Sequence, residues 1–265
     1  MHWLKTYPTL LKAYYARSIE YRGHIIIWIL SSVLPLIMLM VWLTIAGQQG
    51  APIGGYDAVG FISYYLMVTL FRRLTGVWLI WDMDHDIREG ALSPQLLKPL
   101  HPVHYMFANA LAGKPIQLII VLPPIALASI LFGAHYDLSL LSLGLAALAL
   151  FGGMVIEFLV QVIIGTTAFW ITQATAVAEL WFWIRSLLSG WVIPLALFPA
   201  ALIGPLNWLP FRYTLSFPIE IVLGRLSIDQ IVFGFGVEVM WIAIFFFVFQ
   251  RLWRRGLKLY GAVGA

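Results

Sequence analysis

The residues best suited to chemistry gather in one internal segment, residues 82–105, which holds four acids, three histidines and two bases. Within it, His101 and His104 have the spacing of two metal ligands on one helical face. Pro102 disfavours a helix at that point, and the sequence places no third ligand beside the pair. We therefore predict no metal site and no cofactor bound by this chain.

A calcium loop is not predicted either, although three aspartates have the spacing of the first EF-hand ligands: Asp82, Asp84 and Asp86. The sixth position of such a loop requires glycine and is Ile87 here, and the twelfth requires glutamate and is Ser93 here. The sequence therefore assigns these acids no specific role.

Motifs of nucleotide-binding and hydrolytic enzymes do not occur, among them the GxxxxGKS/T phosphate loop, HExxH and GxSxG. The chain therefore does not bind ATP in the P-loop manner. Its apolar runs carry isolated acids, Glu157, Glu179 and Glu238, which are few for acid–base catalysis inside a membrane. We predict that the chain is not an enzyme. An intramembrane lipid-modifying enzyme is the alternative, and an accessory membrane scaffold is a further class that composition leaves open.

The composition is that of a membrane protein. Hydrophobic residues make up 62% and charged residues 11% of the 265 residues, against about 45–50% and about 25% in soluble domains. The lack of cysteine excludes disulfides and thiolate metal sites. No cluster of Lys and Arg forms the basic face that nucleic-acid binding needs. We therefore expect membrane lipid, and no nucleic acid, around this chain.

Six apolar runs are long enough to cross a bilayer, which takes roughly 20 residues. They lack the period-two alternation of barrel strands, so they predict helices. Prolines inside three of them predict kinks: Pro35, Pro123, Pro124, Pro194 and Pro199. The predicted fold class is an all-α membrane protein with one transmembrane domain over residues 1–265, and the spans are about 24–46, 58–80, 115–133, 141–165, 178–202 and 230–250.

The distribution of basic residues predicts the orientation. Lys and Arg are frequent in residues 1–23, in residues 82–114 and after residue 250, whereas the loops at 47–57 and 134–140 have none. Cytoplasmic loops carry the excess of basic residues. Both termini and the 82–105 loop are therefore expected on the cytoplasmic side.

The N-terminal segment, residues 1–23, is predicted to be an interfacial helix. Apolar side chains recur at helical spacing through residues 3–22, with Lys5, Lys12 and Glu20 off the stripe. Such a helix lies in the interface plane with its apolar face in the lipid. The alternative is a soluble cap on the first span.

Two adjacent arginines, Arg72 and Arg73, fall inside the second predicted span. Trp78 and Trp81 mark the cytoplasmic interface of that span, and a central arginine costs about 2.5–3.5 kcal/mol to insert. Neighbouring residues point about 100° apart on a helix, so at least one arginine is expected to face protein or a wet cavity. Two interpretations stay open, a polar translocation path and structural ion pairs, with three candidate partners: Glu157, Glu179 and Arg185.

The loop itself is expected to contain a brief helix at residues 94–98. Gly90 indicates a turn, Ser93 a helix cap and Pro94 a first helical position. Three leucines would then be available to another protein: Leu92, Leu96 and Leu97.

The stretch IREGALSPQLLKPL, Ile87 to Leu100, resembles the cytoplasmic loop between spans two and three of ABC-2-type permeases. These are the membrane subunits of one class of bacterial ABC exporter. The matching residues follow in order: Ile87, Glu89, Gly90, Leu96, Leu97, Lys98 and Pro99. Residues 209–224 resemble the segment before the last span of that family, and residues 254–265 resemble its C-terminal ending.

The resemblance implies one permease subunit of an ATP-driven exporter in the bacterial inner (plasma) membrane. A second permease, identical or related, would complete the path, and a separate ABC ATPase subunit would hold ATP and Mg. The ATPase would bind a coupling helix formed by Ile87, Arg88, Glu89, Gly90, Leu92, Leu96, Leu97 and Lys98. Residues 1–23 would be the elbow helix, and residues 204–225 would fold back at the outer leaflet as short re-entrant helices.

Overall fold

The computed structural model describes residues 2–20, 34–49, 51–171 and 174–260, and within the first range the side chains of residues 7–16. The beginning of the first predicted span, residues 24–33, and the last five residues of the chain lie outside these ranges. No strand occurs in the described residues, where Ile53 and Tyr56 form an isolated bridge. The prediction of an all-helical chain is confirmed at that level.

The helices follow one another with short connections. In chain order they are α1 (His2–Glu20), α3 (Leu34–Gln49), α4 (Ala58–Thr75), α5 (Ile80–Arg88), α6 (Leu92–Leu96), α7 (Pro102–Ala112), α8 (Lys114–Leu131), α9 (Leu140–Thr166), η1 (Thr167–Phe169), α10 (Ala174–Leu188), η2 (Leu195–Leu197), α11 (Ala200–Trp208), α12 (Pro210–Tyr213), α13 (Ser216–Val222) and α14 (Ile228–Leu259).

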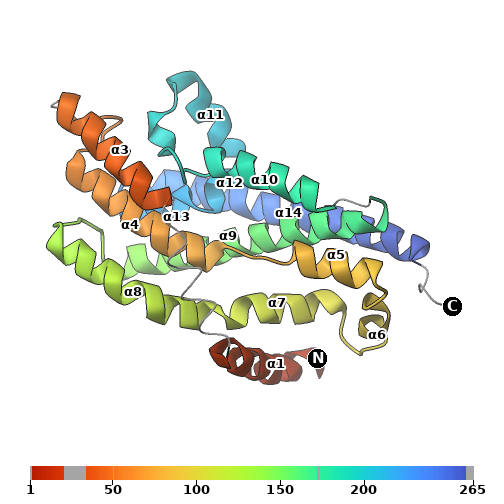
Figure 1. The fold of residues 1–265 in the computed structure, drawn as a ribbon. Coiled ribbons are helices and arrows are strands. Elements are labelled where there is room, and N and C mark those ends of the chain that lie inside the picture. The colour runs from red at the N-terminus through yellow and green to blue at the C-terminus, as the bar shows by residue number, and fades with distance from the viewer. Residues whose placement is uncertain (1, 21–33, 50, 172–173, 261–265) are drawn as a thin grey trace.

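The long helices run lengthwise through the molecule, with α9 and α14 side by side, α7 and α8 in line, and α1 beside α7 (Figure 1). Three stretches in the described ranges are long and apolar enough to cross a membrane: Pro102–Leu131, Leu140–Phe169 and Ile228–Leu259. In the most apolar 18 residues of each stretch, the buried share is 67% for the second stretch, against 17% and 22% for the other two. Helix α9 is therefore the central helix, and the other two stretches present faces suited to lipid.

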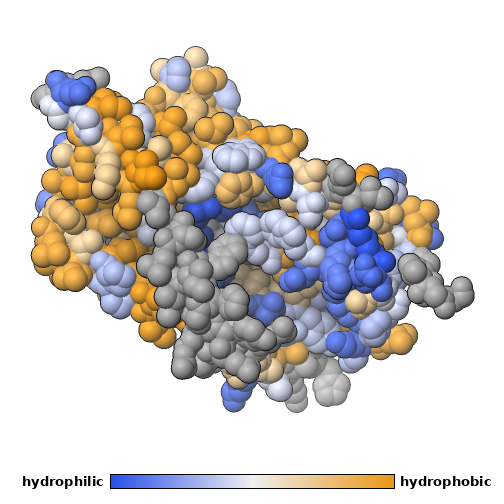
Figure 2. Space-filling view, in the orientation of Figure 1, coloured by the Kyte–Doolittle hydropathy of each residue, from blue (hydrophilic) through white to orange (hydrophobic). Residues whose placement is uncertain are grey.

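Figure 2 shows how hydropathy is distributed over one face of the molecule. Apolar residues cover the end formed by α3, α4 and α8, and hydrophilic residues gather towards the end that carries α5 and α6. Two buried clusters underlie these regions. The larger joins α4, α9, α13 and α14. The smaller joins α5, α6, α9 and α14 through residues that include Met83, Ile87, Leu92, Phe158 and Trp253, and is called here the cytoplasmic cluster after the side on which the sequence predicts the 82–105 loop.

The second predicted span is not one helix. Helix α4 ends at Thr75, Gly76 leaves the helix with φ −60° and ψ 134°, and α5 begins at Ile80. The apolar run is continuous across this point, so hydropathy alone predicts no interruption. Residues 76–79, called here the helix break, separate α4 from the turn formed by α5 and α6, which is called here the cytoplasmic turn after its predicted side.

The fifth predicted span, 178–202, is also wrong as a continuous helix. Helix α10 ends at Leu188, and Gly190 follows with φ +90°, a conformation that favours glycine. The carbonyl of Gly190 accepts a hydrogen bond of 2.7 Å from the hydroxyl of Tyr64 on α4. Pro194 and Pro199 then begin new short helices instead of kinking an old one.

The segment before the last long helix is compact. Three short helices, α11, α12 and α13, occupy it, and every residue of α13 is buried. Helix α13 packs against α9 and α4, and the ring of Phe217 on α13 fills the notch left by Gly234 on α14. Small residues allow such close approach where lipid gives no hydrophobic driving force between helices.

The notch at Gly234 gives a test of this packing. A Cβ at Gly234 would lie 2.2 Å from the Phe217 ring, whereas a Cβ at Gly236 would meet nothing within 4 Å. Overpacking of this kind costs about 1–3 kcal/mol. We expect Gly234→Ala to lower the melting temperature in detergent and Gly236→Ala to leave it unchanged. Equal melting temperatures for the two variants would contradict the packing of α13 on α14.

Candidate functional site

The short helix α6 lies two residues earlier than predicted. It runs from Leu92 to Leu96, its cap is Ala91, and Ser93 makes no cap hydrogen bond. Gly90 turns the chain with φ +75°, and its carbonyl accepts from the amide of Ser93 at 3.1 Å. Burial of Leu92 in the cytoplasmic cluster anchors the start of the helix, so packing overrides the capping signals of the sequence.

The residues predicted to dock a partner divide into a buried and an exposed set. Leu92 is 1% exposed and Ile87 6%, so the prediction that Leu92 is available to a partner is contradicted by its burial in its own chain. Leu96 is partly buried against the same cluster. Leu97, in contrast, is 88% exposed. Three charged residues of the same segment are also exposed: Arg88, Glu89 and Lys98.

The charges of the turn are themselves held in place. Arg88 forms an ion pair of 3.0 Å with Asp84 one helical turn earlier. Gln95 on α6 donates to Asp86 on α5 at 2.6 Å. Of the acids that the sequence left without a role, Asp84 therefore pairs within α5, and Asp86 connects α5 to α6. Asp82 lines a small cavity of about 200 Å³ that Lys98 also lines.

The C-terminal end of α14 supports the turn from behind. The hydroxyls of Ser93 and Tyr260 lie 3.2 Å apart, and the ring of Trp253 lies 4.9 Å from that of His101. Burial lowers the pKa of His101, with His104 adding to the shift. His104 bonds to Tyr7 of α1 at 2.8 Å, so both histidines connect helices. Sequence reasoning missed Trp253 and Tyr260 because nothing in the local pattern predicts which turn they reach.

The helix break leaves backbone groups without helical hydrogen-bond partners, and two side chains act as partners instead. Lys114 at the start of α8 donates to the carbonyl of Arg73 at 3.1 Å and also to that of Gly76. The amide of Leu79 donates to Gln161 on α9 at 3.3 Å. Lys114 is 9% exposed and Gln161 7%. Buried backbone groups cost about 1–3 kcal/mol when unsatisfied, so these side chains make the break tolerable in a membrane.

A chain of polar contacts, called here the polar chain, continues from the break across α9. Gln161 donates to Glu157 at 3.3 Å, one turn along the same helix. Arg185 on α10 donates to Glu157 at 3.2 Å, and its Nε lies 3.2 Å from the other carboxylate oxygen. That Nε also donates to Thr214, after α12, at 3.4 Å. The polar chain therefore links the break to α10 and to the short helices.

The two predicted arginines lie in the last turn of α4, just before the helix break. The guanidinium of Arg72 lies 3.5 Å from the centroid of the Trp191 ring and 6.0 Å from that of Phe182. Such cation–π contacts contribute about 0.5–2 kcal/mol. Arg73 contributes its carbonyl to Lys114. The predicted partner Glu157 is paired with Arg185, so the ion pair is real but joins two of the candidate partners to each other.

The other acids of the apolar helices lie apart from the polar chain. Glu179 is exposed on α10 and has no ion pair with the residues that the structure describes. Glu238 on α14 is 2% exposed and faces Gly152 on α9, where a Cβ would meet the carboxylate at 2.4 Å. Lys114 and Gln161 are two further residues of the site that the sequence analysis missed. A lone amine or amide in an apolar run was their only signal.

One family model matches the part of the chain that contains the helix break and its partners. A family described as "ABC-2 family transporter protein" matches residues 26–264 of the chain. The match includes the helix break, the polar chain and the cytoplasmic turn. A comparison with curated proteins found no match.

Removing the amine of Lys114 tests the helix break. Lys114→Met keeps an unbranched apolar side chain but leaves the carbonyls of Arg73 and Gly76 without this donor. We expect a lower melting temperature and faster amide hydrogen exchange in residues 73–80, measured by mass spectrometry. Lys258→Met, at an exposed site on α14, is the matched control and should change neither. Unchanged exchange in the Lys114→Met protein would contradict the proposed role of the amine.

Charge exchange tests the ion pair of the polar chain. Removing one partner of a buried pair costs about 3–5 kcal/mol, so Glu157→Gln and Arg185→Gln should each reduce the yield of folded protein in detergent. The exchange Glu157→Arg with Arg185→Glu should recover part of that loss. Glu179→Gln, on the same helix as Arg185, should have no effect. Independent losses without recovery in the exchanged protein would argue against direct pairing.

Proposed function

This chain belongs to the ABC-2 family of transporter proteins, and from that premise we propose that it is the permease subunit of an ATP-driven exporter. The ATPase is a separate ABC subunit that binds ATP and Mg, since the sequence carries no phosphate loop. A second permease, identical or related, completes the path through the membrane. The chain lies in the bacterial inner membrane with both termini and the cytoplasmic turn on the inner side.

The observation that carries the proposal is the division of α6 and its flanks into two faces. Leu92 and Ile87 hold the turn against its own chain, whereas Leu97 is 88% exposed in a segment whose Arg88, Glu89 and Lys98 are also exposed. The centre of a protein interface is apolar and its rim polar, so within this family Leu97 is our candidate for the central docking residue. We assign the contact with the ATPase to Glu89, Gly90, Leu97 and Lys98, and the positioning of that contact to the buried set.

Force from the ATPase reaches the membrane part through rigid elements. The cytoplasmic cluster joins α5 and α6 to α9 and α14, so the turn moves with these helices as a body. The helix break lets α5 change direction relative to α4. The polar chain then transmits the displacement from Leu79 through Gln161 and Glu157 to Arg185.

The positions of Trp78 and Trp81 support the proposed depth of the break. Their rings lie 5.3 Å apart and the two residues are 47% and 48% exposed. Tryptophan pairs of this kind are enriched at the level of lipid headgroups. The break therefore lies near the cytoplasmic interface, and the short helices α11 to α13 are the proposed re-entrant segment at the opposite, outer side.

A single exposed leucine provides the test. Leu97→Asp should weaken copurification of the ABC ATPase subunit by about tenfold or more, because a central docking residue contributes about 2 kcal/mol or more. Stimulated ATP hydrolysis in proteoliposomes should fall with it, while the melting temperature stays the same.

Two matched variants define the result. Leu92→Asp should unfold the turn and lower the melting temperature, because that side chain is buried. Leu259→Asp, at a leucine that is 62% exposed on α14, should leave ATPase binding intact. Full ATPase binding by the Leu97→Asp protein would place the contact elsewhere.

A further inference from the structure

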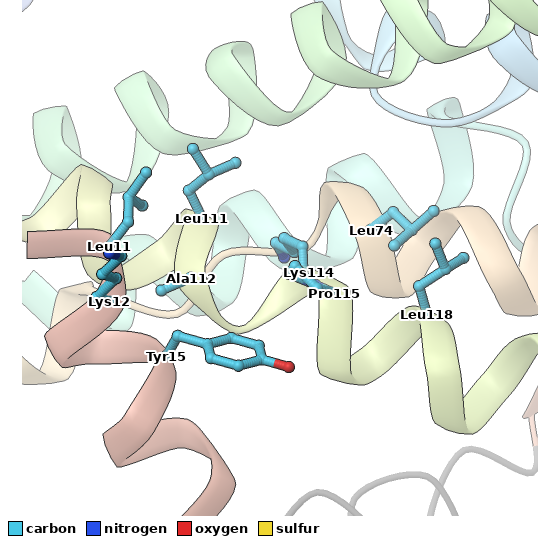
Figure 3. Close-up of a pocket in the computed structure, with 9 residues that line it drawn as sticks. All are labelled: Leu11, Lys12, Tyr15, Leu74, Leu111, Ala112, Lys114, Pro115 and Leu118. Atoms are coloured by element: carbon cyan, nitrogen blue, oxygen red, sulfur yellow. The ribbon is translucent and has the colours of Figure 1, made fainter. Parts of the chain in front are cut away.

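A groove runs between the N-terminal helix and the junction of α7 and α8. Its volume is about 510 Å³, within the range of about 300–1,000 Å³ that small-molecule sites occupy. Figure 3 shows the side chains around it, which come from α1, α4, α7 and α8. Those that bear on the argument are Lys12 of α1, Leu74 of α4, and Lys114 and Leu118 of α8.

The lining of the groove is apolar in spite of its two lysines. The amine of Lys114 is turned away to the carbonyls of Arg73 and Gly76, so its methylene stem faces the groove. Leu118 is 37% exposed, and its neighbour Ile119 is 66% exposed on the outside of the same spanning stretch. The groove therefore continues into the part of α8 that faces lipid, and lipid is the medium that reaches it.

Charge at the rim selects among lipids. Lys12 lines the groove and is exposed on α1, and the first 23 residues contain three further basic residues, Lys5, Arg17 and Arg22. An interfacial helix lies with its apolar face about 5–10 Å below the headgroup boundary, so the exposed amine of Lys12 is at the level of lipid phosphates. Each such residue near an anionic surface gives about a fivefold gain in affinity.

From this geometry we propose that the groove holds an acyl chain of one anionic phospholipid, whose phosphate lies at Lys12. The site does not depend on the transport function proposed above. It adjoins the helix break, because Lys114 both lines the groove and satisfies the carbonyls of the break. A lipid bound there packs against the side chain that holds α4 and α8 together, and so stabilises the break.

Native mass spectrometry of the purified chain with phosphatidylglycerol tests occupancy. We expect one tightly retained phosphatidylglycerol on the unmodified protein. Leu118→Trp fills the groove and should reduce that retention at least tenfold, whereas Ile119→Trp, one residue away on the outward face, should keep it. Equal retention by the two variants, or no retained lipid on the unmodified protein, would overturn the proposal.

The headgroup is tested by comparing phosphatidylglycerol with phosphatidylcholine of the same acyl chains. The unmodified protein should prefer the anionic lipid by about fivefold, and Lys12→Glu should abolish the preference while the melting temperature stays the same. Equal retention of both lipids by the unmodified protein would overturn the assignment of the phosphate to Lys12.

The occupant is identified by a photoreactive benzoylphenylalanine at position 118. Its crosslinks in membranes should carry phospholipid. Crosslinks to another segment of the same chain, or to a second copy, would show that protein and not lipid fills the groove, and would overturn the proposal.

Discussion

An interrupted helix in a membrane protein needs partners for the backbone groups it releases, because lipid offers none. At residues 76–79 those partners are Lys114 of α8 and Gln161 of α9. Because the donor Lys114 and the acceptor Gln161 come from different helices, their hydrogen bonds to the break also position α8 and α9 against the end of α4. Gln161 then engages Glu157, and Glu157 engages Arg185. The positions of four helices therefore follow from one hydrogen-bonding requirement.

The cytoplasmic turn is the opposite case, in which packing and not hydrogen bonding gives rigidity. Leu92 lies in a cluster with Met83 of α5, Phe158 of α9 and Trp253 of α14. Closely packed interiors move as bodies because their side chains interdigitate with few voids. Leu97 stays outside that cluster, at the end of a helix whose other face is fixed. In the proposed mechanism, a displacement of Leu97 would reach α5 and α14 together, and the helix break would let this body tilt against α4.

The sequence predicted the long apolar helices well, since length and composition decide them. It failed where tertiary partners decide. Gly76 and Gly190 interrupt apolar runs that hydropathy reads as continuous, and the partner that stabilises the second break is 126 residues away. Burial of Leu92 shifted the short helix against its capping signals. Glu157 and Arg185 were both named as intramembrane candidates, but pairing between helices depends on which faces meet, and a single sequence does not contain that information.

The packing of α5 explains why it does not continue α4 as one helix, whereas length alone does not, because α14 runs unbroken for 32 residues. A continuous helix from Ala58 to Arg88 would be roughly 45 Å long at about 1.5 Å per residue, against a hydrocarbon core of about 30 Å. Without a break, α5 would continue the line of α4 away from the bundle, and its buried face of Ile80, Met83 and Ile87 would lose α9 as a neighbour. Interrupting the helix after Thr75 returns that face to the bundle. The same interruption leaves a joint at the start of α5, where the proposed mechanism requires movement, so the feature that completes the packing is also the one that the proposal uses for coupling.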